Sequence, residues 1–124
     1  MAAPNLINAN TIVGKTSTSN LTSTAVTTVL NNPANSGKVL KVNTLNLCNY
    51  NSAAVAVTVF YSNAANTTGT SNNSIAGSIS VPANATLNII DKTSQYYLEE
   101  NTSFGAFPAS ANSIAVSISY EDIS

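Results

Sequence analysis

Short runs of alternating apolar and polar residues, each ended by asparagine, proline, glycine or serine, constrain this chain more than any other feature. The clearest run spans residues 53–61, where Val55, Val57 and Val59 fall on one face. The run at residues 113–120 is equally regular. A period of two indicates β-strands, and the Asn- and Pro-rich interruptions indicate turns. No stretch has the 3.6-residue period of an amphipathic helix, so the pattern predicts an all-β protein.

The same pattern predicts five further strands, at residues 11–18, 21–30, 38–49, 75–81 and 87–90. Within the third of these, the apolar positions change face between Val42 and Leu45. Either a β-bulge near Asn43-Thr44 or a strand that crosses between two sheets would explain that change. The stretch 62–74 is rich in Asn, Thr, Ser and Gly and is predicted to be a surface loop.

The chain has 124 residues, the size of one domain. Seven or eight strands with turns at this spacing predict a single antiparallel β-sandwich, of jelly-roll or immunoglobulin-like type. Residues 1–10 do not alternate, so we expect a flexible N-terminal arm followed by one domain at 11–124. The first residues lack the pattern of a signal peptide, and no apolar run is long enough to span a membrane. We therefore expect synthesis and folding in a cytoplasm.

Charged residues make up only 7% of the chain, namely four lysines and five acids with no arginine. Nucleic-acid binding needs a basic stripe, and peripheral membrane binding needs a cationic face, so neither partner is expected. The polar surface consists instead of neutral Asn, Ser and Thr. Such a surface suits packing against another subunit, because few charges lose water at the contact. Random drift in the amino-acid composition of a small domain explains the low share of charged residues equally well.

Residues that carry out chemistry are nearly absent. The chain has no histidine, which removes the commonest general base and metal ligand. Adjacent acids point to opposite faces of a strand, so the doublets Glu99-Glu100 and Glu121-Asp122 are interpreted as solvated strand ends that protect sheet edges. Cys48 is the single cysteine and lies in an apolar run, so we expect it to be buried. The sequence predicts no enzyme activity, no cofactor and no metal site.

Two aromatic clusters are candidates for a contact surface. Tyr96 and Tyr97 precede the first acidic doublet, and Phe104 and Phe107 follow it. On strands, alternate members of each cluster face inward, so at least half of them belong to the core. The rest could anchor a partner, because aromatic side chains contribute strongly to interfaces. Leu6 and Ile7 of the predicted arm are further candidates, since an arm can add a strand to a neighbouring sheet.

Six segments of the chain form a further pattern, namely Met1–Asn5, Thr11–Thr16, Asn32–Val39, Val81–Leu87, Tyr97–Glu100 and Ser119–Ile123. Together they resemble a group of small virion structural proteins from tailed phages of marine bacteria, cyanophages in particular. The resemblance covers almost the whole chain, and its motifs are turns and strands with no catalytic element.

The resemblance implies a virion component that is present in many copies. The leading hypothesis is a capsid decoration (cement) protein, a homo-oligomer and preferably a trimer, that stabilises the head through contacts with the major capsid protein or other virion proteins. The alternatives are a neck, tail or fibre component, and a module that binds carbohydrate on the host surface through Tyr96, Tyr97, Glu99 and Asn101.

Overall fold

The computed structural model describes residues 8–64 and 73–124, and this part of the chain is all-β without an α-helix. It contains nine strands: β1 (Ile12–Leu21), β2 (Thr27–Asn32), β3 (Val39–Asn49), β4 (Val55–Ser62), β5 (Asn73–Val81), β6 (Thr86–Ile90), β7 (Tyr96–Leu98), β8 (Thr102–Pro108) and β9 (Ile114–Ile123). No helix in these two ranges could cross a membrane. The predicted all-β class is confirmed.

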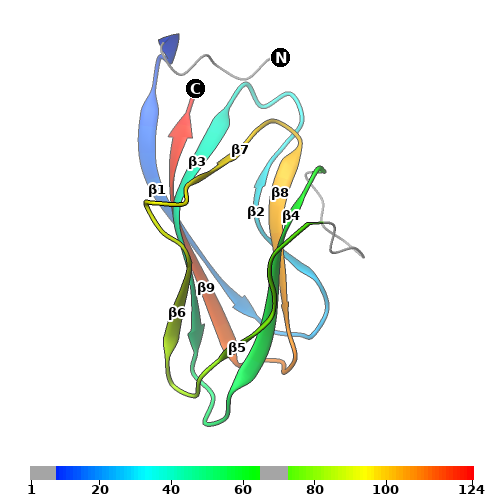
Figure 1. Cartoon of the computed structure of the whole chain (residues 1–124). Coiled ribbons are helices and arrows are strands. Elements are labelled where there is room, and N and C mark those ends of the chain that lie inside the picture. Colours follow the sequence, from blue (N-terminus) through cyan, green and yellow to red (C-terminus); the bar gives the residue numbers. More distant parts are fainter. Residues whose placement is uncertain (1–7, 65–72) are drawn as a thin grey trace.

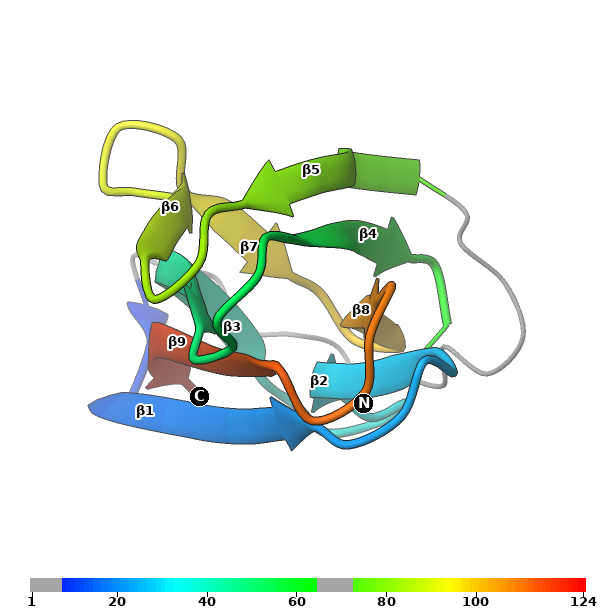
Figure 2. The same cartoon turned by 90° about the horizontal axis from the view of Figure 1, so that it is seen from below.

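The strands form two antiparallel sheets that pack face to face as a β-sandwich (Figures 1 and 2). The first sheet has the order β1-β9-β3-β6, with β7 also paired to β3. The second sheet has the order β2-β8-β4-β5. The pairing is nested, because β1 pairs with β9, β2 with β8, β3 with β6 and β7, and β4 with β5. Partners far apart in the sequence therefore lie side by side, and the start of β1 and the end of β9 lie at the same end of the sandwich (Figure 1).

The change of face predicted within residues 38–49 is a β-bulge in β3. The pairing of β3 with β9 shifts by one residue between Val42 and Thr44. Because of this shift, Val42 and Leu45 both point inward and are fully buried. The alternative, a strand that passes between the two sheets, is therefore wrong.

The prediction of one strand over residues 21–30 is wrong as well. β1 extends to Leu21, the chain then turns over residues 22–26, and β2 begins at Thr27 in the other sheet. The segment Thr-Ser-Thr-Ala contains neither glycine nor proline, so nothing local marks the turn.

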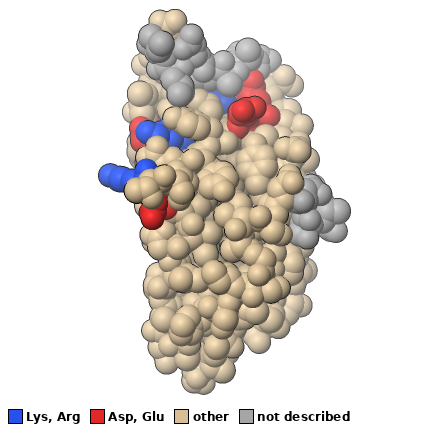
Figure 3. All heavy atoms as spheres, viewed as in Figure 1, with Lys and Arg blue, Asp and Glu red and all other residues tan. Residues whose placement is uncertain are grey.

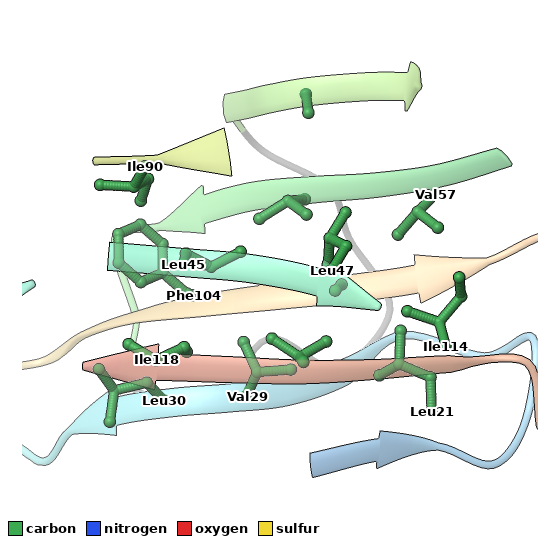
Figure 4. Close-up of a cluster of buried hydrophobic side chains, with 14 of the residues drawn as sticks. Leu21, Val29, Leu30, Leu45, Leu47, Val57, Ile90, Phe104, Ile114 and Ile118 are labelled. Atoms are coloured by element: carbon green, nitrogen blue, oxygen red, sulfur yellow. The ribbon is translucent and has the colours of Figure 1, made fainter. Parts of the chain in front are cut away.

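The hydrophobic core lies between the sheets and draws on both (Figure 4). Phe104 of β8 is fully buried and packs edge to face against Tyr61 of β4 and Tyr96 of β7. Val57 and Val59 of β4 point into the core, and Phe60 points to the opposite face of the strand. Because Phe60 is also fully buried, β4 is covered on both faces. The ring of Phe60 lies 6.3 Å from that of Phe107.

The chain joins the first sheet before β1 begins. The N–H groups of Asn10 and Thr11 both donate to the carbonyl of Ser124, at 2.8 and 2.9 Å. Asn10 therefore belongs to the folded domain rather than to the predicted arm. Most of the arm, including Leu6 and Ile7, lies outside the described residues. The predicted loop at 62–74 is described only at its ends, and it is shorter than expected because β5 begins at Asn73.

Candidate docking surface

Charge is strongly segregated along the long axis of the sandwich. All four lysines and all five acids fall within the described residues. Most of them lie at the end of the sandwich that is uppermost in Figure 1, near the ends of β1, β3 and β9 and in the turn between β7 and β8. Asp91 and Lys92 follow β6 and lie near the middle of β3. Figure 3 shows charged atoms over the upper part of the visible face and none over its lower part.

The opposite end of the sandwich carries no charged side chain. It consists of four loops, at residues 22–26, 50–54, 82–85 and 109–113, which we call the neutral end (seen head-on in Figure 2). Most of its side chains are small and exposed. The exposed residues are Thr22, Ser23, Thr24, Ala25, Tyr50, Ser52, Ala53, Ala54, Pro82, Ala83, Asn84, Ala109, Ser110, Ala111 and Asn112. Tyr50 is the one large aromatic side chain among them, with 49% of its surface exposed.

A buried asparagine holds three of these loops in place. Asn49, at the end of β3, is completely buried, and its side-chain nitrogen donates to the carbonyls of Ala53 and Val81, both at 2.9 Å. Its side-chain oxygen accepts from the N–H of Asn51 at 2.9 Å. Asn51 in turn donates to the hydroxyl of Ser113 at 3.1 Å. One connected set of hydrogen bonds thus spans the β3–β4, β5–β6 and β8–β9 loops.

Backbone contacts complete this framework. The N–H of Tyr50 donates to the carbonyl of Ser113 at 3.0 Å, and the N–H of Asn112 donates to the carbonyl of Leu21 at 3.0 Å. Asn84 and Asn112 have φ angles of 55° and 57°, a left-handed conformation that asparagine tolerates better than most residues. The loops at 50–54, 82–85 and 109–113 are therefore tied to one another or to a strand end, and these three loops form one ordered framework within the neutral end.

The upper end is organised around a buried carboxylate. Asp122 of β9 is 7% exposed, and its Oδ2 atom accepts hydrogen bonds from Lys15 Nζ at 2.9 Å and from Lys38 Nζ at 3.1 Å. Burial alone would raise the pKa of Asp122, but the hydrogen bonds and charges of the two lysines outweigh it, so the pKa lies below its usual value. The hydrogen bond to Asp122 raises the pKa of Lys15.

The predicted role of the acidic doublets at sheet edges needs correction. β9 lies between β1 and β3, so Glu121 and Asp122 are in an interior strand. Glu100 also has a structural role, because its carboxylate accepts from the N–H of Gly37 at 3.0 Å. The contact of Asp122 with a sheet edge is indirect: its carboxylate accepts a hydrogen bond from Lys15, which belongs to the edge strand β1.

The two predicted aromatic clusters separate into core and surface residues. Phe104 is fully buried, which places it in the core. Phe107 is half-buried beside Phe60. Tyr96 is half-buried against Phe104, and Tyr97, the next residue, is 42% exposed. Of the six candidate interface residues, Tyr97 is the most accessible of the four that the structure describes.

The tyrosines line a shallow pocket between the sheets. The pocket has a volume of about 340 Å³ and is bounded by Tyr61, Tyr96 and Tyr97, together with Asn73, Ser74 and Ile75 of β5. Its lining has aromatic rings, one amide and several hydroxyl groups, and no charge. Such a lining can stack against and hydrogen-bond to a neutral polar ligand. Glu99 and Asn101, which the carbohydrate hypothesis also names, do not line it.

Cys48 is not buried in the core as expected. It alternates with the buried Leu47 and Asn49, so its side chain lies on the outer face of the first sheet, where it is half-buried. Within residues 8–64 and 73–124, no group of three or more metal-ligating side chains comes together.

Sequence reasoning missed Tyr50 and Asn49, the two residues that most define the neutral end. A signal was present, because the stretches 50–54, 82–85 and 109–113 contain no charged residue. What the pattern did not reveal is that these turns share one end of the molecule. Searches of protein-family models, of curated proteins and of solved structures find no match to this chain.

Proposed function

We propose that this protein is a structural component of a virus particle that acts without catalysis, by binding other virion proteins through its neutral end. The observation that carries this proposal is the segregation of charge: nine charged residues lie in the upper and middle parts of the sandwich, and four loops without charge form the lower end. The specific role we propose is that of a capsid decoration (cement) protein.

The physical argument concerns the free-energy cost of binding. Charged groups lose favourable hydration when a contact buries them, so a surface without charge avoids this penalty. Loops already held by Asn49 and Asn51 lose little conformational freedom on binding, which removes a second cost. Tyr50 supplies an exposed aromatic side chain of the type that dominates interface energies. The neutral end therefore suits binding to an uncharged protein surface.

The strand order supports a jelly roll as the particular type of sandwich. If β6 and β7 are counted as one interrupted strand along β3, eight strands pair first with last, second with seventh, third with sixth and fourth with fifth. This nesting is the wrapped hairpin of a jelly roll, an architecture common in viral capsid proteins and lectins.

The resemblance of the sequence to small virion proteins of marine tailed phages points to the same function. We propose the major capsid protein as the partner, and the virion, after synthesis in the host cytoplasm, as the location. A homo-oligomer would bind at several points at once, and such multivalency strengthens attachment without any new type of contact.

The test is incorporation into particles. Phage that encode Tyr50→Asp or Ser110→Asp, each of which adds a charge to the neutral end, should carry far fewer copies per major capsid protein, measured by quantitative mass spectrometry. Gln95→Glu adds the same charge to an exposed site away from this end and should be incorporated normally. Normal incorporation of both neutral-end variants would contradict the proposal. A wild-type copy number of only a dozen or so would favour a neck, tail or fibre component instead.

A second candidate function is carbohydrate binding, favoured by the pocket of Tyr61, Tyr96 and Tyr97. Its neutral lining suits an uncharged sugar, which stacks on aromatic rings and bonds to amides and hydroxyls. A glycan array separates the two functions. Binding that is lost in Tyr97→Ala but kept in Tyr50→Asp would support a lectin, and absence of binding to all glycans would exclude this candidate.

A further inference from the structure

The free edge of β1 is the most regular sheet edge in the described part of the molecule. β1 pairs with β9 without interruption from Ile12 to Leu21. The other edge strands are shorter or irregular. β2 has six residues and a register shift, β6 has five residues and a shift, β7 has three, and β5 has two shifts and a left-handed residue at Ser78. Bulges and short strands protect an edge against pairing, and β1 has neither protection.

The backbone groups at this edge can be assigned residue by residue. Thr11 and Ser124 exchange two backbone hydrogen bonds at 2.9 Å, so this is a hydrogen-bonded pair of the antiparallel ladder. Since such pairs alternate along a ladder, the odd-numbered residues of β1 bond to β9. The N–H and C=O groups of the even-numbered residues Ile12, Gly14, Thr16, Thr18 and Asn20 therefore point away from β9, to the free side.

The side chains of β1 also leave this edge accessible. Seven of the ten residues of β1 are exposed, and Ile12 and Val13 are two of the four exposed large hydrophobic residues in the described part of the chain. A lysine commonly protects an edge, but the single lysine of β1 is bound by Asp122 at 2.9 Å. The positive charge of Lys15 is thus paired with the carboxylate of Asp122 in the same molecule, which weakens its ability to repel another strand.

We propose that β1 pairs antiparallel with β1 of a second copy, around a two-fold axis at Thr16. In this register Ile12 lies opposite Asn20, Gly14 opposite Thr18, and Thr16 opposite itself. The five even-numbered residues of each copy then form about ten backbone hydrogen bonds. Lys15 lies opposite Ser17, so no like charges meet, and the Thr16 pair is of a type that stabilises antiparallel strands.

The second copy is the partner that the edge itself indicates. A regular ten-residue edge pairs fully only with another long and unbulged edge, and among the described strands only β1 has one. Contact between identical strands is symmetric and closes at two copies. The two first sheets would then join into one continuous sheet, and this contact does not depend on the neutral end or on the virion.

The test measures mass in solution by analytical ultracentrifugation, from micromolar concentrations to about 1 mM, because pairing through one strand with few apolar side chains gives weak association. Wild type should form a concentration-dependent dimer. Thr16→Pro removes the central N–H donor and should be monomeric, while proline at an edge position that faces solvent leaves the fold intact. Thr16→Val keeps the donor and should dimerise as wild type does.

A pair of charge variants tests the register and needs no proline. Thr16→Lys alone and Thr16→Glu alone place like charges directly opposite each other, and each should dimerise about fivefold more weakly than wild type. An equimolar mixture of the two should form a heterodimer at least as stable as the wild-type dimer. Each of three results would overturn the proposal: a wild-type protein that is monomeric at all concentrations, a wild-type trimer, or dimerisation of Thr16→Pro, Thr16→Lys or Thr16→Glu that equals that of wild type. Loss of this dimer with normal incorporation into particles would leave the proposed function unaffected.

Discussion

The side-chain nitrogen of Asn49 donates a hydrogen bond of 2.9 Å to the carbonyl of Val81. This bond connects the end of β3 in one sheet to the end of β5 in the other, at the end of the molecule that carries no charge. It is completely buried, in contrast to most of the polar side chains around it. A single amide therefore joins the two layers of the sandwich below the hydrophobic core.

Substitution of Asn49 tests this role. Asn49→Ala leaves the carbonyls of Ala53 and Val81 and the N–H of Asn51 without their side-chain partner, and should lower the free energy of unfolding by about 2–4 kcal/mol. Urea denaturation measures the loss. Asn88→Ala, at an exposed site in β6, is the matched control and should change stability by less than about 0.5 kcal/mol. Equal effects of the two substitutions would refute the structural role of Asn49.

The ion pairs of Asp122 predict how stability depends on pH. The folded-state pKa of Asp122 is lowered, so its contribution is present above the unfolded pKa, near 4, and is lost as pH falls through the folded pKa. The folded-state pKa of Lys15 is raised, so its contribution is present below about pH 10.4 and is lost as pH rises through the folded pKa. The pair should therefore stabilise the fold at a constant level between these limits.

Asp122→Asn should remove this contribution and lower stability by about 1–2 kcal/mol at neutral pH, since the carboxylate is buried but both lysines are partly exposed. Its stability should also fall less steeply than that of wild type below pH 4. Glu99→Gln, at an exposed acid three residues before β8, is the control. Thermal unfolding across a pH series measures both effects, and identical acid limbs for wild type and Asp122→Asn would be the contrary result.

Phe104 and Phe107 should differ in their effect on stability although they lie three residues apart. Phe104→Ala removes a fully buried ring that packs on Tyr61 and Tyr96, and we expect a loss of about 3–5 kcal/mol. Phe107→Ala removes a half-buried ring with one aromatic neighbour, so about 1–2 kcal/mol is expected. Equilibrium unfolding in urea compares the two. A larger loss for Phe107 would mean that the core is centred elsewhere.

Cys48 should react with a small thiol reagent while the protein is folded. Its side chain lies half-buried on the outer face of the first sheet, where it borders a shallow depression of about 170 Å³. Mass spectrometry after incubation with iodoacetamide under native conditions should show complete modification. The control is the double variant Cys48→Ser with Ala106→Cys, whose cysteine replaces a fully buried residue and should stay unmodified until the protein unfolds.

Local pattern predicted several elements well, because alternation and turn residues act over only a few positions. The strand around Val55, Val57 and Val59 follows from neighbouring residues and is present, and the change of face near Asn43 is explained by a bulge, one of the two alternatives that the pattern left open. The turn at 22–26 was missed because it contains no glycine, proline or asparagine, and because Thr22, Thr24 and Val26 are residue types common in strands. Cys48 was misplaced, since an apolar run does not reveal which face of the sheet will be covered.

The sequence by itself determined that the chain forms strands, where most of them turn, and that its side chains offer almost no charge and no histidine. These properties are local or additive, so they can be read along the chain. Only the tertiary structure decided that four uncharged turns meet at one end, that Asp122 reaches both Lys15 and Lys38, and that β1 keeps a free edge. Those relationships join residues up to 107 positions apart, and they arise from how the two sheets exchange strands.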